Sequence, residues 1–446
     1  MRSIDEVKWA ISATIIFFLI YSVAASEPKE EWNKTFGGPY GDGAWSLQKT
    51  HDGGYIITGF TSSKGQGSDL WLVKINSSGQ KEWDKIIGGS QEDVGYCAKQ
   101  TSDYGYVTAG TTKSFGMGSE YIWLVKNDAN GTRKWDKTFG GYVSSSGDGA
   151  WEIDETRDEG YIIVGYTRSF GAGAKDLWLI KTDANGKEEW QRTFGGPKDD
   201  VGMSVLQAAD DGYLIVGRTA SYGAGKDDIW LIKTNSTGRE EWNRTFGGAE
   251  DDVGLQIAQA KNGYAIAGRT ESEGPDKMAF LIKTDLSGKK LWEKVYGKDS
   301  TAICLQQTAD GGFILVGHIE TKDAGRDAWL VKTDASGIEQ WDMRLGGLGQ
   351  DMATSVAQSD DVGYIVAGIT NSYGAGAEDA WLIKVRLENT TSNNSTITSE
   401  NVTENLASGN NSNGNPTSEG DVTSKSNVAP KRIQSMQIKD LFNSHP

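Results

Sequence analysis

Several residue types that support chemistry or crosslinking are scarce in this chain of 446 residues. It holds 2 cysteines, too few for a disulfide scaffold or a cysteine-rich zinc site. Its 3 histidines leave few candidates for histidine-dependent catalysis. Basic residues number 45 against 61 acidic ones, for a net charge of −16, whereas a nucleic-acid binder needs a basic face. The composition therefore argues against an enzyme and against a nucleic-acid-binding protein.

Long apolar runs are also scarce, and the clearest is WAISATIIFFLIYSVAA at 9–25. Val23 and Ala25 match the small residues that precede a signal-peptidase cleavage site. The run is shorter than the about 20 residues that a membrane helix needs. We expect residues 1–25 to be a signal peptide, with an uncleaved N-terminal membrane anchor as the alternative. Either interpretation places the protein outside the cell or at the cell surface.

The C-terminal part has a different composition. Residues 387–428 are dominated by Asn, Ser and Thr and cannot bury enough apolar surface to offset the entropy of ordering. We expect a disordered tail there, followed at 429–446 by a short segment whose role the sequence does not reveal. N-x-S/T motifs are glycosylation candidates in an exported protein, although Asn-rich segments also generate them by chance: Asn33, Asn76, Asn130, Asn235, Asn243, Asn389, Asn393, Asn394, Asn401 and Asn410.

Two motifs recur seven times between these ends, at spacings of 49 to 55 residues. In the first, of the type E-W-x-[KR]-T-F-G-G, the tryptophan lies at positions 32, 83, 135, 190, 242, 292 and 341. In the second, W-L-[IV]-K, the aromatic residue lies at positions 71, 123, 178, 230, 280, 329 and 381. Such self-similarity marks a repeat architecture. The two motifs use 13 of the 16 tryptophans.

Each repeat has the pattern of four short strands. In the first complete copy these are Ala44–Thr50, Tyr55–Thr61, Asp69–Ile75 and Glu82–Ile87, rich in β-branched and aromatic residues. A [DN]-x-x-G segment joins the third strand to the fourth, which suits a type I turn followed by a left-handed glycine. The middle strands are apolar on both faces and so need a neighbouring sheet on each side.

Seven small sheets, each flanked by copies of itself, predict an all-β, seven-bladed β-propeller of four-stranded antiparallel blades over residues 27–386. The array begins at Glu31–Phe36 with a fourth-strand motif and ends at Ala353–Val385 with three strands lacking a fourth. We expect the N-terminal strand to complete the last blade, because this leaves no interior edge unpaired.

Two repeated residues invite a choice between a structural and a functional role. A glycine recurs in each second strand, and we expect a neighbouring indole to lie over it. A lysine ends each W-L-[IV]-K motif, either as a ring of positive charge for an anionic ligand or, as we favour, with its stem on an aromatic ring and its ammonium in water. These lysines are Lys74, Lys126, Lys181, Lys233, Lys283, Lys332 and Lys384.

An aspartate precedes the first strand in six repeats, with Ser300 in the remaining one. Its carboxylate either fixes the turn between blades by accepting backbone N–H bonds or, less favoured because no calcium-loop motif is present, binds Ca²⁺. No other cofactor is expected. The candidate calcium ligands are Asp42, Asp93, Asp148, Asp200, Asp252 and Asp351.

The residue after the second-strand glycine varies in chemistry while its neighbours do not, which we interpret as freedom from packing. Arg218, Arg269 and His318 lie in consecutive repeats and would form one polar patch. Cys97 and Cys304 lie three repeats apart, too far around a ring for a disulfide, so no disulfide is expected. No catalytic residue is proposed; the candidate ligand-binding residues are Phe60, Tyr166, Arg218, Arg269 and His318.

With these motifs in view, the chain resembles the tandem-repeat β-propeller surface proteins of methanogenic archaea from about Glu31 to Arg386. That resemblance implies secretion or surface display and a binding or structural role. The W-L-[IV]-K-T-D-x-x-G-x-x-x-W stretch is also similar to the repeat of pyrroloquinoline-quinone dehydrogenases. Those enzymes typically have eight blades and often an adjacent cysteine pair, which this chain lacks.

Three functional hypotheses follow. The favoured one is a non-catalytic interaction or adhesion module that binds an extracellular protein or glycan. The alternatives are a structural part of the cell envelope and an extracellular quinoprotein- or glycan-cleaving enzyme. A glycosidase needs two carboxylates at a set separation, and a ring of equivalent aspartates offers no asymmetric pair. Membrane contact is expected only through an uncleaved N-terminal segment.

Overall fold

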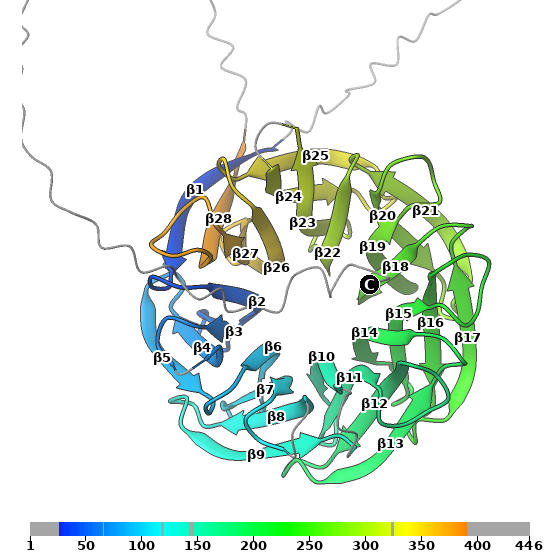
Figure 1. The fold of residues 1–446 in the computed structure, drawn as a ribbon. Helices are drawn as coiled ribbons and strands as arrows, with labels where there is room; N and C mark the ends of the chain where they lie inside the picture. Colours follow the sequence, from blue (N-terminus) through cyan, green and yellow to red (C-terminus); the bar gives the residue numbers. More distant parts are fainter. Residues whose placement is uncertain (1–25, 66, 117–119, 142–146, 323–324, 390–446) are drawn as a thin grey trace, which may run out of the picture.

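A computed structural model of the chain describes residues 26–65, 67–116, 120–141, 147–322 and 325–389. These residues form seven four-stranded sheets arranged in a ring (Figure 1). The predicted seven-bladed β-propeller is confirmed. The predicted signal peptide at 1–25, the tail from 390 and the segment 429–446 lie outside the described residues. None of the described residues forms a helix with the length and hydropathy needed to cross a membrane.

Each blade runs outward from the axis through four antiparallel strands. The innermost strands are β2 (Asp42–Lys49), β6 (Asp93–Gln100), β10 (Gly149–Glu155), β14 (Asp200–Gln207), β18 (Asp252–Ala260), β22 (Ser300–Gln307) and β26 (Asp351–Ser359). The second strands are β3 (Tyr55–Thr61), β7 (Tyr106–Thr112), β11 (Tyr161–Thr167), β15 (Tyr213–Thr219), β19 (Gly263–Thr270), β23 (Phe313–Thr321) and β27 (Gly363–Thr370). The third strands are β4 (Asp69–Ile75), β8 (Tyr121–Asn127), β12 (Asp176–Thr182), β16 (Asp228–Thr234), β20 (Met278–Thr284), β24 (Gly325–Thr333) and β28 (Asp379–Asn389). The outermost strands are β5 (Lys81–Ile87), β9 (Arg133–Phe139), β13 (Glu188–Phe194), β17 (Glu240–Phe246), β21 (Lys290–Tyr296), β25 (Glu339–Leu345) and β1 (Ser26–Phe36).

The N-terminal strand closes the ring. Blade 7 has the strand order β1-β28-β27-β26, and β1 pairs with β28 along its whole length, from Ser26 opposite Asn389 to Phe36 opposite Ala380. Figure 1 shows β1 outside β28, between blades 6 and 1. The predicted closure is confirmed. Because β28 extends to Asn389, residues 387–389 belong to the propeller and not to the tail, which corrects the predicted boundary.

The strand directions give the disc two different faces. The loops between blades and those between second and third strands emerge at one end, which we call the upper face. The hairpins between first and second and between third and fourth strands form the lower face. In the predicted [DN]-x-x-G hairpins the glycine has a left-handed conformation, as at Gly79, where φ is 70°, and its N–H bonds the Asn76 carbonyl at 2.9 Å.

Tryptophans join the blades. At five of the seven blade junctions the outer-strand indole packs on the aromatic residue near the start of the second strand of the next blade, for example Trp83 on Tyr106 at 5.6 Å and Trp190 on Tyr213 at 5.8 Å between centroids. The third-strand indole Trp71 lies in a core cluster with residues of blade 7, including Ile365. The repeated tryptophans therefore pack between neighbouring blades.

Each second-strand glycine lies directly opposite the third-strand aromatic residue, as Gly59 does opposite Trp71, but its closest contact is with backbone. A Cβ atom built on Gly59 would lie 1.8 Å from the carbonyl oxygen of Gly43, and the equivalent glycines meet the equivalent first-strand carbonyl. The cause is a β-bulge in each innermost strand, which brings the first-strand backbone against the second strand. Glycine is therefore required by the close approach of two backbones.

The repeated lysines do not form a ring of exposed positive charge, and their ammonium groups are not in water. Both interpretations of these lysines are therefore wrong. Six of the seven ammonium groups are buried and pair with the aspartate of the adjoining first hairpin, as in Lys126–Asp103 at 2.8 Å and Lys181–Asp158 at 2.9 Å. Blade 5 lacks this aspartate because its hairpin contains Lys261 and Asn262. There Lys283 donates to the Thr284 carbonyl at 2.8 Å, and burial lowers the pKa of Lys283.

These pairs make the propeller sensitive to acid. Partial burial acts to raise the pKa of the carboxyls, but hydrogen bonds from a threonine and the lysine outweigh it and lower the pKa of Asp52 and Asp103 to about 2. The pKa is also lowered at Asp158, Asp210, Asp310 and Asp361. Because these values lie below the unfolded value of about 3.9, the stabilisation is complete above about pH 4 and is lost as the pH falls toward 2.

We therefore expect the melting temperature to fall steeply between about pH 4 and pH 2. Each pair should contribute only about 0.5–1 kcal/mol, because its carboxylate is exposed and screened by water. Calorimetric scans across this range measure the effect, and an Asp52→Asn/Asp103→Asn variant should show a shallower decline. A melting temperature that is flat with pH, or equal slopes for both proteins, would contradict it.

Candidate functional site

The six aspartates that begin the innermost strands are buried joints between blades. Asp200 shows the pattern: its Oδ2 accepts the Gly196 N–H at 2.8 Å and the Ser221 hydroxyl at 2.7 Å, and its Oδ1 accepts the Thr219 hydroxyl. Gly196 follows the outer strand of blade 3, whereas Thr219 and Ser221 belong to blade 4. Each carboxylate therefore fixes the turn between two blades, as the favoured interpretation predicts.

In blade 6 both the aspartate and its threonine donor are replaced. Ser300 stands for the aspartate and Ile319 for the threonine, and the Ser300 hydroxyl donates to the Tyr296 carbonyl and accepts the Ala279 N–H, both at 3.0 Å. The serine is sufficient because the threonine donor is absent as well.

The geometry of these joints does not favour calcium. The carboxylates lie in separate blades, each facing hydrogen-bond donors, and the described residues contain no cluster of three or more His, Cys, Asp or Glu side chains able to hold a metal. Ca²⁺ requires six to eight oxygen ligands. We expect EDTA to leave the melting temperature unchanged in differential scanning fluorimetry; a fall that added Ca²⁺ reverses would restore the calcium hypothesis for Asp42 and its equivalents.

The five predicted ligand-binding residues are all buried near the upper face, so the inferred freedom from packing is wrong. Phe60 and Tyr166 lie in separate apolar clusters, each opposite a first-strand glycine, Gly43 or Gly149. A Cβ atom built on Gly149 would lie 2.7 Å from the Tyr166 ring. The ring and the opposing glycine therefore vary together.

The structure does bring Arg218, Arg269 and His318 together, since each acts electrostatically on its neighbour. Arg218 forms a buried ion pair with Asp227. Burial lowers the pKa of Arg269, and the Arg218 charge lowers it further. Burial also holds the pKa of His318 well below its usual value, with the positive charges of Arg326 and Arg269 acting in the same direction. This polar group lies beneath the surface of blades 4 to 6.

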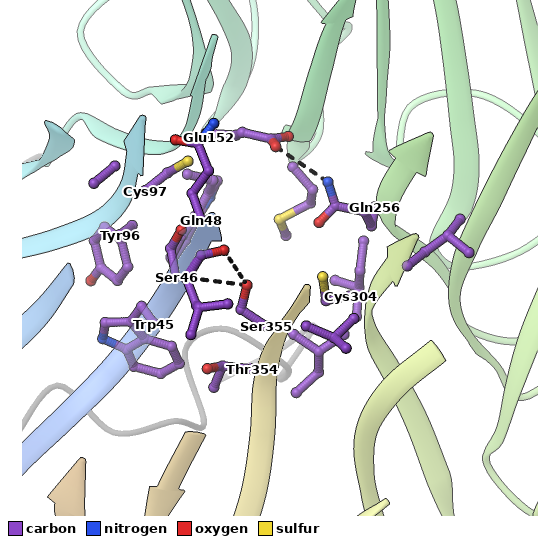
Figure 2. A pocket seen from close by; sticks show the side chains of 18 of the residues that line it. Trp45, Ser46, Gln48, Tyr96, Cys97, Glu152, Gln256, Cys304, Thr354 and Ser355 are labelled. Carbon is purple, nitrogen blue, oxygen red and sulfur yellow. Dashed lines mark hydrogen bonds between the residues drawn. The ribbon is translucent and has the colours of Figure 1, made fainter. Parts of the chain in front are cut away.

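A cavity lies in the central channel, and its lining was not predicted as a site from the sequence. Its volume is about 280 Å³, and it is lined by innermost-strand residues (Figure 2). Each innermost strand has its bulge at the same position, and a bulge re-aims side chains. The bulged residues all line the cavity: Trp45, Tyr96, Trp151, Met203, Leu255, Ile303 and Thr354.

The channel is chemically asymmetric. Blades 1 to 3 contribute an aromatic arc in which Tyr96 lies 5.9 Å from Trp45 and 4.8 Å from Trp151 between ring centroids. Blades 4 to 6 contribute aliphatic side chains at the same level. The sequence did contain a signal: Trp45 and Trp151 are the two propeller tryptophans that neither repeated motif explains.

A polar layer lies next to the bulged residues. The Glu152 carboxylate accepts the Val205 N–H at 3.0 Å and the Gln256 amide N–H at 3.2 Å. Burial raises the pKa of Glu152, and the Lys99 charge opposes the shift. Burial acts to lower the pKa of Lys99, but acidic groups around it, of which the Asp154 carboxylate 3.8 Å away acts most strongly and Glu152 adds to it, together outweigh burial and raise the pKa.

Both cysteines line this channel from opposite sides (Figure 2). They are free, as predicted for first strands three blades apart. Cys97 is buried and its thiol lies 3.8 Å from the Ile153 carbonyl oxygen, whereas Cys304 is half-buried. Burial raises the pKa of both thiols, that of Cys97 to about 11. Both are therefore thiols, not thiolates, at neutral pH.

The candidate glycosylation sites fall into three groups. Asn33, Asn130 and Asn243 are exposed. Asn76 and Asn235 are half-buried, and their side-chain oxygens accept N–H bonds within their own hairpins. Asn389 ends β28, and the remaining candidates lie outside the described residues: Asn393, Asn394, Asn401 and Asn410.

A further surface feature is an apolar patch on the upper face. It is defined by Leu348, Tyr373 and Tyr40, which are 92%, 41% and 59% exposed. Their loops adjoin one another, since the Tyr373 hydroxyl donates to the Gly346 carbonyl at 2.6 Å and a Cβ atom on Gly376 would lie 2.2 Å from the Tyr40 carbonyl oxygen. The loops come from the junctions of blades 6, 7 and 1.

Comparisons with known proteins give the fold but no family. No family profile matches the chain. The regulatory protein FlaEY of Caulobacter vibrioides is 25% identical over 130 residues, and the match covers 26% of this chain but only 13% of that protein. The chain thus corresponds to a small part of that relative, and the relative's regulatory role does not transfer with it.

Solved structures with a similar fold are WD40 propellers. The WD40 β-propeller domain of Doa1 has a TM-score of 0.50 and 11% identity, covering 81% of this chain and 98% of that one. The WD40 domain of Neurospora crassa Pan2 also has a TM-score of 0.50, with 10% identity, covering 80% and 96%. At such low identity the likeness supports the propeller fold alone.

Proposed function

We propose that this chain is a secreted or cell-surface β-propeller that acts as a non-catalytic binding module for an extracellular protein, through the upper face at blades 6, 7 and 1. The observation that carries the proposal is the apolar patch of Leu348, Tyr373 and Tyr40. Large apolar side chains gathered on adjoining loops mark interaction sites, and tyrosine is enriched in the cores of protein interfaces.

The patch combines a residue that follows the repeat with one that departs from it in most loops. Tyr373 has Phe170 and Tyr222 as equivalents, which are 42% and 47% exposed. At the position of Leu348 one other inter-blade loop has Tyr142, whereas four have Pro39, Ser90, Pro197 and Ala249, which offer less apolar surface. A rigid propeller holds such loops in a fixed arrangement, which lowers the entropic cost of binding.

Export is part of the proposal and is supported by the leader-like run at 9–25 and by the motifs shared with archaeal surface propellers. We place the chain with those tandem-repeat surface proteins on the strength of its seven copies of both motifs. An interaction role requires no catalytic group, which agrees with the few histidines and the absence of an asymmetric carboxylate pair among the ring of aspartates.

The proposal is tested with a Leu348→Asp/Tyr40→Asp variant of the full-length chain. A matched control, Leu286→Asp/Ile338→Asp, places the same charges on exposed apolar residues of the lower face. Immobilised proteins are used to capture binders from the extracellular fraction of the host, which are quantified by mass spectrometry. We expect a protein retained by the wild type and the control to fall at least tenfold with the upper-face variant. Equal capture by all three proteins would refute this face as the binding surface.

A further inference from the structure

The central channel holds open space between the innermost strands of all seven blades. Protein interiors are packed as densely as organic crystals, yet here a cavity of about 280 Å³ remains among the innermost strands. The volume is at the small end for ligand clefts, which fits a single small ring and excludes a folded segment. Each of the seven blades has one bulge that directs a side chain into the cavity. The cavity is therefore a consequence of the repeated strand structure.

One wall of the cavity is aromatic. Trp45, Tyr96 and Trp151 lie on three consecutive blades, with neighbouring ring planes inclined by 48° and 60°. None belongs to the repeated tryptophan positions that hold the blades together. The C–H groups on one face of a sugar ring pack against such rings, because they are apolar and carry the small positive charge that an aromatic face attracts.

The polar groups of the cavity include donors and acceptors in similar measure. The carbonyl ends of Gln48 and Gln306 accept the Gln100 and Gln358 N–H groups at 2.7 and 2.9 Å, which leaves the NH₂ group of each of these lining amides as a donor. Lys99 adds an ammonium group. The acceptors of the lining are the Glu152 carboxylate and the hydroxyl oxygens of Ser46 and Thr354. Asp154 pairs with Lys99 but is not itself a lining residue.

The mixture of hydrogen-bond donors and acceptors indicates which class of ligand the cavity can bind. A phosphate or other strong anion would meet the Glu152 carboxylate, and the one ammonium group of the lining, that of Lys99, is already paired with Asp154. A bare cation would lack a cluster of ligands, since the described residues contain none able to hold a metal. A hydroxyl group both donates and accepts, and several hydroxyls on one ring match a ring of mixed donors and acceptors. A site built to bond hydroxyls discriminates strongly against analogues that lack them.

From this combination we propose that the central channel binds one neutral sugar ring, stacked on the aromatic arc of blades 1 to 3 and hydrogen-bonded to Glu152, Lys99 and the glutamine amides. The site lies inside the disc and is distinct from the upper-face patch. It requires neither that patch nor a protein partner, so each proposal can fail without the other.

The test uses the full-length chain and a panel of glucose, galactose, mannose, xylose and N-acetylglucosamine. Saturation-transfer NMR detects binding, and titration followed by tryptophan fluorescence gives the affinity. We expect at least one sugar to bind, and Trp45→Leu or Glu152→Gln to weaken it at least tenfold. The Leu348→Asp/Tyr40→Asp variant serves as the control and should bind the sugar as the wild type does.

A second measurement avoids any variant that fails to fold. Cys304 and Cys97 line the cavity, so a bound sugar should slow alkylation of Cys304 by iodoacetamide several-fold in the unmodified protein, at a pH near 9. No binding by any sugar of the panel, an unchanged alkylation rate at saturating sugar, or undiminished binding by both folded channel variants would each overturn the proposal.

Discussion

Removal of β1, residues 26–36, is expected to lower the melting temperature of the propeller by on the order of 10 °C or more. The deletion strips β28 of its partner along the whole strand and leaves an open row of N–H and C=O groups. It also removes Trp32 and Phe36 from the cluster that joins blades 7 and 1. The ring would then be held at that junction by its inner strands alone.

Thermal melts followed by circular dichroism measure this effect. Deletion of residues 390–446 is the control and should leave the melting temperature within about 2 °C of the wild type, since the described propeller ends at Asn389. A synthetic peptide of residues 26–38 should restore part of the loss when added to the shortened protein. An unchanged melt after removal of β1 would refute the register of blade 7.

The second large effect is expected from Asp200→Ala. This change leaves the Gly196 N–H and the hydroxyls of Thr219 and Ser221 without their buried acceptor. Unpaired buried donors are costly, and we expect a loss of about 3 kcal/mol of unfolding free energy, or roughly 5–10 °C in melting temperature. Denaturant unfolding gives the free energy directly.

The chain supplies its own control for this prediction. Ser300 occupies the equivalent site in blade 6, where the threonine donor is replaced by Ile319. Ser300→Asp should therefore destabilise the protein as well, because the new buried carboxylate finds too few donors, whereas Asp200→Asn, which keeps one acceptor, should cost less than Asp200→Ala. If Ser300→Asp stabilised the protein, or Asp200→Ala had no effect, the proposed joint would be wrong.

The fold was predictable because it depends on features that repeat. The strands of the first blade, the hairpin glycines such as Gly79 and the completion of blade 7 by the N-terminal strand all follow from the spacing of two motifs. Seven copies of the sequence pattern predict the same local structure, so a misleading pattern in one copy is outweighed by the other six. The strand limits differ by only a few residues, as for Ala44–Thr50 against the observed Asp42–Lys49.

The roles of single repeated residues were harder to predict, because they depend on long-range partners. Nothing near Lys74 in the sequence shows that its ammonium group pairs with Asp52, which is 22 positions earlier. Likewise Gly59 was assigned to an indole because both recur, whereas the decisive neighbour is a backbone carbonyl that approaches through a bulge. Alternation patterns do not reveal a bulge, since they assume a regular strand.

The candidate site was missed for the same reason. Without the bulge, Trp45 and Glu152 are parts of ordinary strands with no special exposure, and variable residues at Phe60 and its equivalents are the more conspicuous choice. The tryptophans outside the two motifs were the available clue. Large aromatic residues that lie outside the repeated motifs are therefore better candidates for a binding site than positions that only vary from copy to copy.

The central claim, a ring of seven blades closed by its own N-terminal strand, is tested most directly by a disulfide across the closing pair. Lys29 lies directly opposite Arg386 in adjacent strands, where opposed Cα atoms are about 4.5–5.5 Å apart, within the range that a disulfide spans. A Lys29→Cys/Arg386→Cys variant in a Cys97→Ser/Cys304→Ser background should form an intramolecular disulfide on mild oxidation, detected by intact and peptide mass spectrometry. The control Lys29→Cys/Glu188→Cys, which joins blades 7 and 3, should form none. Failure of the 29–386 bond, or efficient formation of the control bond, would contradict the closed ring.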